Sequence, residues 1–391
     1  MKKFTRFGVR DAAPNDPWRP SSTPIYQTAT FEQESPEHFG RYDYARSGNP
    51  TRAALEEHCA RLEGACGACA FASGIAAVAV VTRLVRPGET IVAHEDLYGG
   101  SQRLLTRVCA ERGIDVRYAD LVNGDRARWS AALPATTALV LVESLSNPLW
   151  RAPDLRALAD VTHERGAILC VDATAMSPWL QRPLALGADV VVHSATKLLS
   201  GHGDLTAGIV ACAAPELQER IAFLQNAEGA VLGPFDSWLL LRGMKTLGVR
   251  IERQQESARR VAEWLAARDD VTRVHFASLA SHPDRERHAR QADGPGVVLS
   301  FETGDDGRSA DIVRRLDRFA IAVSFGSVDS SASLPCRMSH ASVPADRQLL
   351  PPDLIRLSIG LEDPEDLIAD LERALPVAQR LCPLQERVGV R

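Results

Sequence analysis

Four short runs between residues 90 and 192 constrain the fold of this chain more than any other feature. Each run is almost entirely apolar, which is typical of strands buried on both faces of a parallel sheet. Longer stretches with helical character separate one run from the next. The runs occupy residues 90–93, 139–142, 168–171 and 190–192. The sequence therefore predicts an α/β protein with a mostly parallel sheet.

Polar residues directly follow each of these runs. Open α/β sheets bind their ligands beyond the carboxyl ends of the strands, so all four strands should deliver polar side chains to one edge. These side chains are His94, Glu95 and Asp96, then Glu143 and Ser144, then Asp172, and finally His193 and Ser194.

The length of 391 residues predicts two domains and a preceding arm. Residues 1–48 are rich in Pro, Asp and Arg and are expected to form the N-terminal arm. A large domain is expected over residues 49–245 and a smaller α+β domain over residues 246–391.

Helix signals are clearest at four places. Asn49 is a plausible cap for a helix over residues 51–62, with Pro50 at its first position. A long helical stretch over residues 236–267 is expected to link the two domains. The second domain is predicted to contain an apolar strand over residues 296–301 and a final helix over residues 363–375.

Composition and charge exclude several classes of function. The net charge of −5 offers no basic surplus for a nucleic-acid backbone. The longest apolar run, residues 75–81, is too short to span a bilayer. The first 20 residues contain no secretory signal, and eight scattered cysteines favour reduced thiols, so a cytoplasmic protein is expected.

Two local patterns suggest metal or redox chemistry but are better explained otherwise. Cys66 and Cys69 form a CxxC, with Cys59 as a third candidate ligand, yet no second CxxC or spaced His pair follows. Small buried residues are the preferred interpretation, and no metal is expected. Residues 282–288 hold two histidines among charged neighbours and are predicted to form a solvated loop.

Lys197 is one of only four lysines in the chain. A lysine with a lowered pKa forms a Schiff base, which an arginine cannot do. Lys197 follows the last apolar run, and the hydroxyls of Ser194 and Thr196 precede it. This layout is that of a pyridoxal phosphate (PLP) lysine with adjacent phosphate ligands; the alternative is a surface lysine in a loop.

Other residues supply what PLP needs. Asp172 ends a strand 25 residues before Lys197 and can keep the pyridine nitrogen protonated; a helix-capping aspartate is the alternative. Ser73, Gly74 and Ile75 open an apolar helix, whose N-terminus is a natural phosphate site.

Three further polar or aromatic residues are candidates at the same edge of the sheet. Tyr98, on a Gly-rich turn, could stack on the cofactor ring or simply be a turn tyrosine. Asn147 could contact the ring hydroxyl. Arg356 lies on an apolar strand and needs a carboxylate, which either a substrate or a structural ion pair would provide. No G-x-S-x-G, Walker A, H-E-x-x-H or dinucleotide motif occurs.

Together these segments resemble the Cys/Met-metabolism branch of fold-type I PLP enzymes, which includes cystathionine γ-synthases, cystathionine γ- and β-lyases and methionine γ-lyases. The resemblance runs from about residue 24 to residue 375. Its motifs are residues 44–51 (YARSGNPT), 98–100 (YGG), Asp172, 194–197 (SATK), 201–204 (GHGD), 356–358 (RLS) and 360–363 (GLED).

The resemblance implies the fold-type I architecture: a mostly parallel, seven-stranded sheet with a smaller α+β C-terminal domain. It also implies that Lys197 forms the Schiff base and moves protons, that Asp172 holds the pyridinium and that Tyr98 stacks on the ring. The phosphate would be held by Ser73, Gly74, Ile75, Ser194 and Thr196, and the substrate carboxylate by Arg356, Asn147 and Ser324. Tyr44 and Arg46 would complete the site of a neighbouring subunit, in a homotetramer built from two active dimers.

Several positions depart from the family pattern. Ala173 and Ala175 replace an asparagine and a phenylalanine and are expected to widen the surroundings of the cofactor, and Leu145 replaces a proline. Phe325 replaces a leucine. Val323 stands where cystathionine-handling enzymes commonly carry glutamate, and Gly100 stands where methionine γ-lyases carry cysteine.

We therefore expect PLP-dependent γ-elimination from an amino acid with a sulfur or other heteroatom leaving group. The products would be a 2-oxo acid, ammonia and the leaving group. The alternatives are γ-replacement by a cystathionine γ-synthase or homoserine-ester sulfhydrylase, a cystathionine β-lyase, a PLP-binding protein with little turnover, and a CxxC redox protein.

Overall fold

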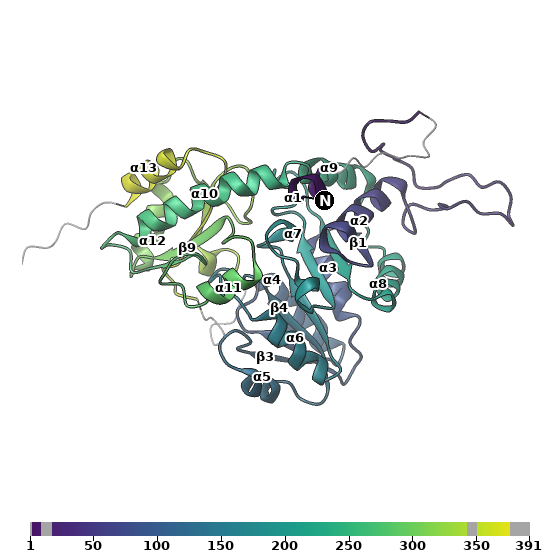
Figure 1. Cartoon of the computed structure of the whole chain (residues 1–391), viewed down its shortest axis with the longest axis horizontal. Coiled ribbons are helices and arrows are strands. Elements are labelled where there is room, and N and C mark those ends of the chain that lie inside the picture. The colour runs from purple at the N-terminus through teal and green to yellow at the C-terminus, as the bar shows by residue number, and fades with distance from the viewer. Residues whose placement is uncertain (1, 9–17, 342–349, 376–391) are drawn as a thin grey trace, which may run out of the picture.

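The structure, a computed structural model, describes residues 2–8, 18–341 and 350–375 of the chain. It contains a seven-stranded sheet and a five-stranded sheet, each with its own helices. Figure 1 shows the five-stranded unit on the left, the larger sheet on the right, and the long helix α10 running between them.

The seven-stranded sheet has the strand order β1-β7-β6-β5-β4-β2-β3. Strand β7 runs antiparallel to both of its neighbours, and the other pairings are parallel. The four predicted runs became β2, β4, β5 and β6, which confirms the expected fold class. The strands are β1 Gly67–Phe71, β2 Thr90–His94, β3 Asp115–Ala119, β4 Thr137–Glu143, β5 Ile168–Asp172, β6 Val190–Ser194 and β7 Gly208–Cys212.

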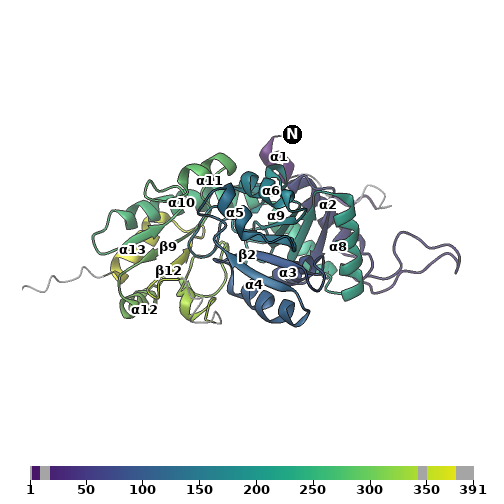
Figure 2. The same cartoon turned by 90° about the horizontal axis from the view of Figure 1, so that it is seen from below.

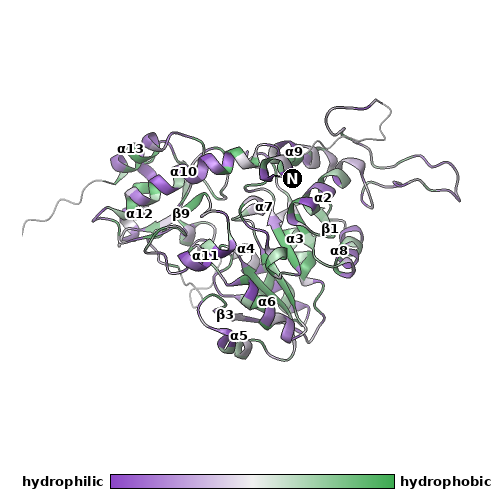
Figure 3. Cartoon of the chain, in the orientation of Figure 1, coloured by the Kyte–Doolittle hydropathy of each residue, from purple (hydrophilic) through white to green (hydrophobic). Residues whose placement is uncertain are grey.

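Helices cover both faces of this sheet (Figure 2). The first long helix, α2, begins as predicted, because the side chain of Asn49 accepts the backbone N–H groups of Thr51 and Arg52. The helices are α2 Pro50–Glu63, α3 Gly74–Thr82, α4 Gly99–Arg103, η1 Leu104–Cys109, α5 Arg126–Ala132, α6 Leu155–Glu164, α7 Ser177–Leu180, η2 Pro183–Leu186 and α8 Pro215–Glu228. In Figure 3, α3 and the central strands form the most hydrophobic part of the molecule.

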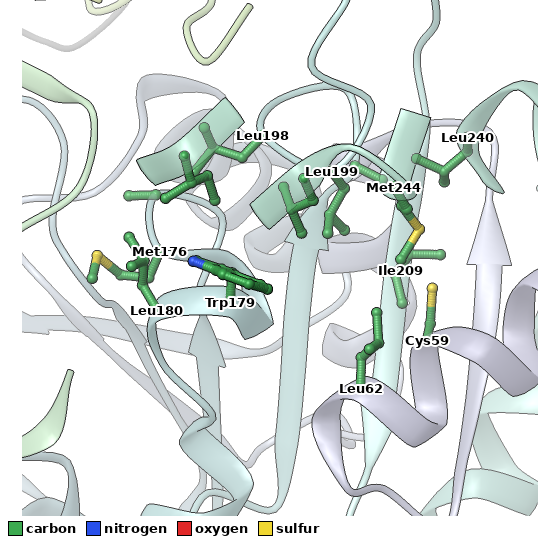
Figure 4. Close-up of a cluster of buried hydrophobic side chains, with 14 of the residues drawn as sticks. Cys59, Leu62, Met176, Trp179, Leu180, Leu198, Leu199, Ile209, Leu240 and Met244 are labelled. Atoms are coloured by element: carbon green, nitrogen blue, oxygen red, sulfur yellow. The ribbon is translucent and has the colours of Figure 1, made fainter. Parts of the chain in front are cut away.

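The turn that carries Lys197 is anchored by a hydrophobic cluster beneath it. Leu198 and Leu199 are buried and pack in the same cluster as Trp179 and Met244 (Figure 4). Burying such a leucine stabilises a fold by roughly 1.5–3 kcal/mol. The two residues after Lys197 therefore fix the turn, and the lysine is left to extend from a rigid support.

The C-terminal unit is built on a mixed sheet of order β10-β11-β12-β9-β8. Its strands are β8 Arg273–His275, β9 Val298–Glu302, β10 Ala320–Ile321, β11 Ser331–Ser333 and β12 Ile355–Ser358. Its helices are α11 Arg285–Gln291, α12 Asp306–Arg315, η3 Pro335–Arg337 and α13 Pro364–Ala374, and α9 Pro234–Met244 and α10 Leu247–Ala266 lead into it. The expected strand and final helix are present as β9 and α13.

The long helical stretch predicted over residues 236–267 is present, but it is made of two helices rather than one. It is divided into α9 and α10, because the carbonyl of Gly243 accepts the hydroxyl of Thr246 and the guanidinium of Arg250. Gly243 also packs so closely on the backbone of Ser200 that a Cβ would lie 2.5 Å from its carbonyl oxygen. The helix thus ends where the chain meets the turn that follows Lys197.

The solvated loop predicted for residues 282–288 is wrong. His282 and His288 are buried, and Asp284 accepts hydrogen bonds from Arg151 Nε (2.6 Å) and from the backbone N–H of Ala152 (3.2 Å). A buried carboxylate is stable here because an arginine of the large unit pairs with it. This contact joins the C-terminal unit to the loop that follows β4.

The N-terminal part of the chain consists of the short helix α1 Lys3–Phe7 and an extended segment. Residues 18–48 reach away from the body of the molecule on the right of Figure 1. An isolated bridge pairs Thr30 with Tyr44. Within the described parts of the chain, no helix combines the length and apolar character required to cross a membrane.

Candidate active site

A cavity of about 400 Å³ lies between the carboxyl ends of β4, β5 and β6 and the C-terminal unit. Eight of the cofactor- and substrate-binding candidates line it, although they come from segments far apart in the chain. They are Tyr98, Asn147, Asp172, Ser194, Lys197, Val323, Ser324 and Arg356.

The amine of Lys197 lies inside this cavity. Its Nζ donates a hydrogen bond of 2.5 Å to the hydroxyl of Ser324. Burial, followed by the positive charge of Arg356, lowers the pKa of Lys197 to about 8, although Asp172 opposes the shift. A sizeable fraction of the amine is therefore neutral near pH 7–8, which Schiff-base formation requires.

Asp172 ends strand β5 with one oxygen engaged and one available. Its Oδ1 accepts both the N–H (2.9 Å) and the hydroxyl of Thr174. Its Oδ2 accepts no hydrogen bond from the described residues. Burial raises the pKa of Asp172, while Thr174, His193 and Lys197 oppose this rise. A cationic N–H group bound in the cavity would be able to donate a hydrogen bond to this second carboxylate oxygen.

The residues predicted to hold a phosphate lie at the start of α3 and after β6. The Ser73 hydroxyl caps α3 by accepting the N–H of Ala76 at 3.2 Å. Gly74 allows the helix to approach β6, because a Cβ there would lie 2.6 Å from the Cβ of Ser194. The helix N-terminus, with the backbone of Gly74 and Ile75, thus lies beside the Ser194 hydroxyl.

Thr196 is placed differently from Ser194. Its hydroxyl donates to the carbonyl of Ala207 (3.3 Å) and accepts the N–H of the same residue (3.0 Å). It borders a neighbouring cavity of about 580 Å³ rather than the one that contains Lys197. Its role as a phosphate ligand stays a prediction.

Arg356 has the environment of a carboxylate receptor. It is 3% exposed, its Nη1 donates to Asn147 Oδ1 (2.9 Å), and its Nη2 donates to the carbonyl of Ser324 (2.8 Å). Burial lowers its pKa to about 10. Among the described residues no carboxylate pairs with it, so the structural ion pair considered from the sequence is not found there. A buried guanidinium of this kind favours an anionic ligand.

Tyr44 and Arg46 do not line the cavity of their own chain. Both are exposed on the extended arm, where the Arg46 guanidinium lies over the Tyr44 ring and donates to the carbonyl of Asn226 at 2.9 Å. Their contribution to a neighbouring subunit stays a prediction.

The two alanines after Asp172 have different surroundings. Ala175 lines the cavity, as expected. Ala173 is fully buried in the hydrophobic cluster between the sheet and α6, so the expectation that it widens the cavity is wrong.

Sequence reasoning assigned no role in the site to several residues of the cavity, among them Glu143, Arg103 and Phe325. Glu143 was visible only as a polar strand end, and Arg103 gave no signal beyond its position five residues after Tyr98. Phe325 was noted only as a departure from the family; its ring lies 5.3 Å from Lys197 Nζ and 5.5 Å from the Arg356 guanidinium.

The CxxC does not form a joint site. The Cys66 thiol donates to the carbonyl of Cys212 (3.2 Å), whereas the Cys69 sulfur accepts from Gln218 (3.2 Å). Cys69 is buried, as expected, but Cys66 is exposed, because it lies just before β1 begins. Within the described ranges, no three His, Cys, Asp or Glu side chains are grouped as metal ligands.

The arrangement is that of a PLP enzyme, and the sequence matches the family described as Cys/Met metabolism PLP-dependent enzyme over residues 9–376. The chain belongs to this family. It is a PLP-dependent lyase of cysteine and methionine metabolism, and its residues fit the cofactor: a buried amine of lowered pKa, an available carboxylate oxygen and a helix N-terminus that only a glycine allows so close to Ser194.

Individual relatives differ in the reaction that their names state. A chloroplastic cystathionine β-lyase of Arabidopsis thaliana is 48% identical over 362 residues, which cover 92% of this chain and 78% of the relative. A cystathionine γ-lyase of Bacillus subtilis is 41% identical over 90% of this chain and 94% of its own length. The crystal structure of metB from Corynebacterium glutamicum superimposes with a TM-score of 0.93 at 37% identity, over 96% of this chain and 98% of that one.

Proposed function

We propose that this enzyme cleaves a cystathionine-type thioether amino acid by β-elimination. The observation that carries the proposal is the buried Arg356 guanidinium, which lacks a carboxylate partner among the described residues and lies in the same cavity as Lys197. This pair suits an amino acid whose α-carboxylate is held while its Cα proton is removed. The 48% identity to a cystathionine β-lyase favours the β position.

Positive charge in the cavity favours an anionic substrate. The guanidinium groups of Arg103 and Arg356 both line it. Val323, which is 59% exposed, provides no charge for a distal ammonium. Recognition of the distal end should therefore depend on its carboxylate more than on its amine.

The residues of the chain have distinct tasks in this reaction. Bound PLP supplies an electron sink that makes the Cα proton of the substrate acidic. Arg356 and Asn147 hold the α-carboxylate, and Lys197 Nζ accepts the Cα proton and delivers a proton to the leaving sulfur. Asp172 keeps a proton on the ring nitrogen, and Tyr98 covers the ring. Cystathionine and water are thereby converted into homocysteine, pyruvate and ammonia.

γ-Elimination, the reaction expected from the sequence, is the second candidate. The 41% identity to a cystathionine γ-lyase favours it, and the same residues would serve. Lys197 would then remove a proton from Cβ as well as from Cα, and cystathionine and water would give cysteine, 2-oxobutyrate and ammonia.

We also propose a shared site in a homodimer that pairs into a tetramer. Tyr44 and Arg46 are exposed on an arm that reaches away from its own chain, and both side chains suit a phosphate. An arm of this form is able to reach a second copy of the chain.

Products from cystathionine distinguish these reactions. The PLP-loaded enzyme is incubated with cystathionine, and the 2-oxo acids and thiols are separated by liquid chromatography and mass spectrometry. Pyruvate with homocysteine is expected. 2-Oxobutyrate with cysteine would establish γ-elimination instead, and cystathionine synthesis from an activated homoserine without 2-oxo acid release would establish replacement. Absence of turnover on a panel of amino acids would indicate a PLP-binding protein.

A further inference from the structure

We infer that Glu143 is a positioning residue that fixes the distance between two walls of the active site. The Tyr98 wall covers the cofactor ring, and the Asn147–Arg356 wall receives the substrate carboxylate. The inference rests on the proposed function for the roles of these two walls, while the geometry of Glu143 stands independently of it.

Glu143 is the last residue of β4, and both of its carboxylate oxygens are engaged. Its Oε1 accepts the backbone N–H of Tyr98 at 2.6 Å, and its Oε2 accepts the backbone N–H of Asn147 at 3.1 Å. The side chain is 6% exposed and lines the cavity. One carboxylate at a rigid strand end therefore joins the start of α4 to the loop after β4.

Each hydrogen bond holds the backbone of a residue that lines the proposed active site. The N–H of Tyr98 belongs to the residue whose ring faces the cavity, so its position sets how far the ring lies over the cofactor. The side chain of Asn147 accepts from Arg356 Nη1 at 2.9 Å. A displacement at Asn147 would therefore turn the guanidinium that holds the substrate.

A carboxylate suits this position better than an amide of the same size. Two backbone N–H groups need two acceptor oxygens, whereas a glutamine offers one oxygen and one NH₂ donor. One of the two backbone N–H groups would then be buried against the NH₂ donor of the glutamine and left without an acceptor. Burial and the neighbouring Asp172 raise the pKa of Glu143 well above its ordinary value, while the N–H groups of Tyr98 and Asn147 oppose that rise. Burial and Asp172 thus disfavour a charged Glu143 side chain. The two N–H contacts favour the ionised form, because that form has two acceptor oxygens.

The same two loops are also joined by a contact that does not line the cavity. The Ser146 hydroxyl donates to Asp96 Oδ2 and accepts the N–H of Arg151 at 3.1 Å. Ser146 and Asp96 are buried, and neither borders the space that contains Lys197. Ser146→Ala is therefore the matched control: it weakens the link between the loops but leaves the Tyr98 and Asn147 contacts in place.

The test compares Glu143→Gln and Glu143→Leu with Ser146→Ala in the PLP-loaded protein. The visible circular dichroism of the bound cofactor reports the tilt of its ring, and titration of the apoprotein with PLP gives the dissociation constant. Both Glu143 variants should lose most of the visible circular dichroism and bind PLP roughly 10-fold more weakly or worse, as expected for one lost hydrogen bond to a charged group. KM for cystathionine should rise by a similar factor. Ser146→Ala should lower the melting temperature and leave these three quantities unchanged.

Two outcomes would overturn the inference. In the first, the Glu143 variants keep the visible spectrum and PLP affinity of the wild type and lose only thermal stability, as Ser146→Ala does. In the second, hydrogen exchange of the wild-type protein shows that the backbone amides of Tyr98 and Asn147 are unprotected. This measurement tests the two hydrogen bonds even if a variant does not fold. The spectrum, PLP titration and exchange need no substrate, so failure of the proposed reaction on cystathionine would leave the inference testable.

Discussion

Replacing Arg356 with lysine tests whether this buried guanidinium is the receptor for the substrate carboxylate. The change keeps the positive charge, so it removes hydrogen bonds rather than the electrostatic attraction. The guanidinium donates to Asn147 and to the carbonyl of Ser324, and both bonds are short, at 2.9 and 2.8 Å. These two partners hold the side chain in the orientation that leaves its remaining N–H groups for a ligand.

The expected magnitude follows from counting donors. A guanidinium has five N–H groups, so three remain after the two anchoring bonds, whereas a lysine ammonium has three in total and keeps only one. A substrate carboxylate that accepts two bonds from arginine therefore loses at least one. A hydrogen bond to a charged group contributes about 1.5–3 kcal/mol, so kcat/KM should fall about 10- to 150-fold.

The assay measures the total 2-oxo acid formed from cystathionine, so that it applies to either elimination. Arg253→Lys is the control, because Arg253 pairs with Asp363 at an exposed position and an exposed ion pair contributes little. Its kcat/KM should stay within about twofold of the wild type. If Arg356→Lys also keeps kcat/KM within a factor of about three of the wild-type value, the substrate carboxylate does not bind to Arg356. The number of N–H donors at this position would then have no bearing on the activity.

Four further predictions follow from the site. Lys197→Ala should abolish turnover and the covalent fixation of PLP by borohydride, whereas Lys245→Ala should retain both; mass spectrometry of borohydride-treated protein checks this, and fixed PLP on Lys197→Ala would refute the assignment. Arg46→Ala should weaken PLP retention about 10- to 150-fold, and re-formed mixtures with Lys197→Ala subunits should regain activity, since a hybrid dimer has one intact site; absence of recovery would argue against a shared site. Because burial lowers the pKa of Lys197 to about 8, the rate at which PLP attaches to the apoprotein should rise with pH with a midpoint near 8 and level off at higher pH, and a midpoint near 10.5 would contradict the lowered pKa. Val323→Glu should lower KM for cystathionine relative to an uncharged thioether amino acid, because a carboxylate meets the distal ammonium; an unchanged ratio of the two KM values would place the distal end away from Val323.

Much of the fold could be predicted from patterns within short segments of the sequence. Apolar runs of strand length, with polar residues after them, predicted the parallel core of the sheet and the edge at which the site lies. Asn49 and Pro50 predicted the start of α2, because capping involves only neighbouring residues. Lys197 and Asp172 could be proposed as cofactor residues from the sequence alone, because the covalent and acid–base chemistry of PLP requires particular residue types.

Contacts between distant segments were decided only by the tertiary structure. Gly243, just before the break between α9 and α10, packs against Ser200, and Asp284, two residues after the buried His282, pairs with Arg151. Neither pair is close in sequence, so no local pattern records it.

The orientation of side chains within the site has the same origin. Ser194 and Thr196 are alike in the sequence, yet Thr196 directs its hydroxyl to Ala207, whereas Ser194 lines the cavity. In the sequence, Glu143 is only one of several polar residues at the ends of strands. In the fold, its carboxylate accepts the N–H groups of Tyr98 and Asn147. The sequence by itself determined which chemical groups the protein has available. The packing of the two units determined which groups face one another, because hydrogen bonds and burial depend on distances that no local segment of the chain sets.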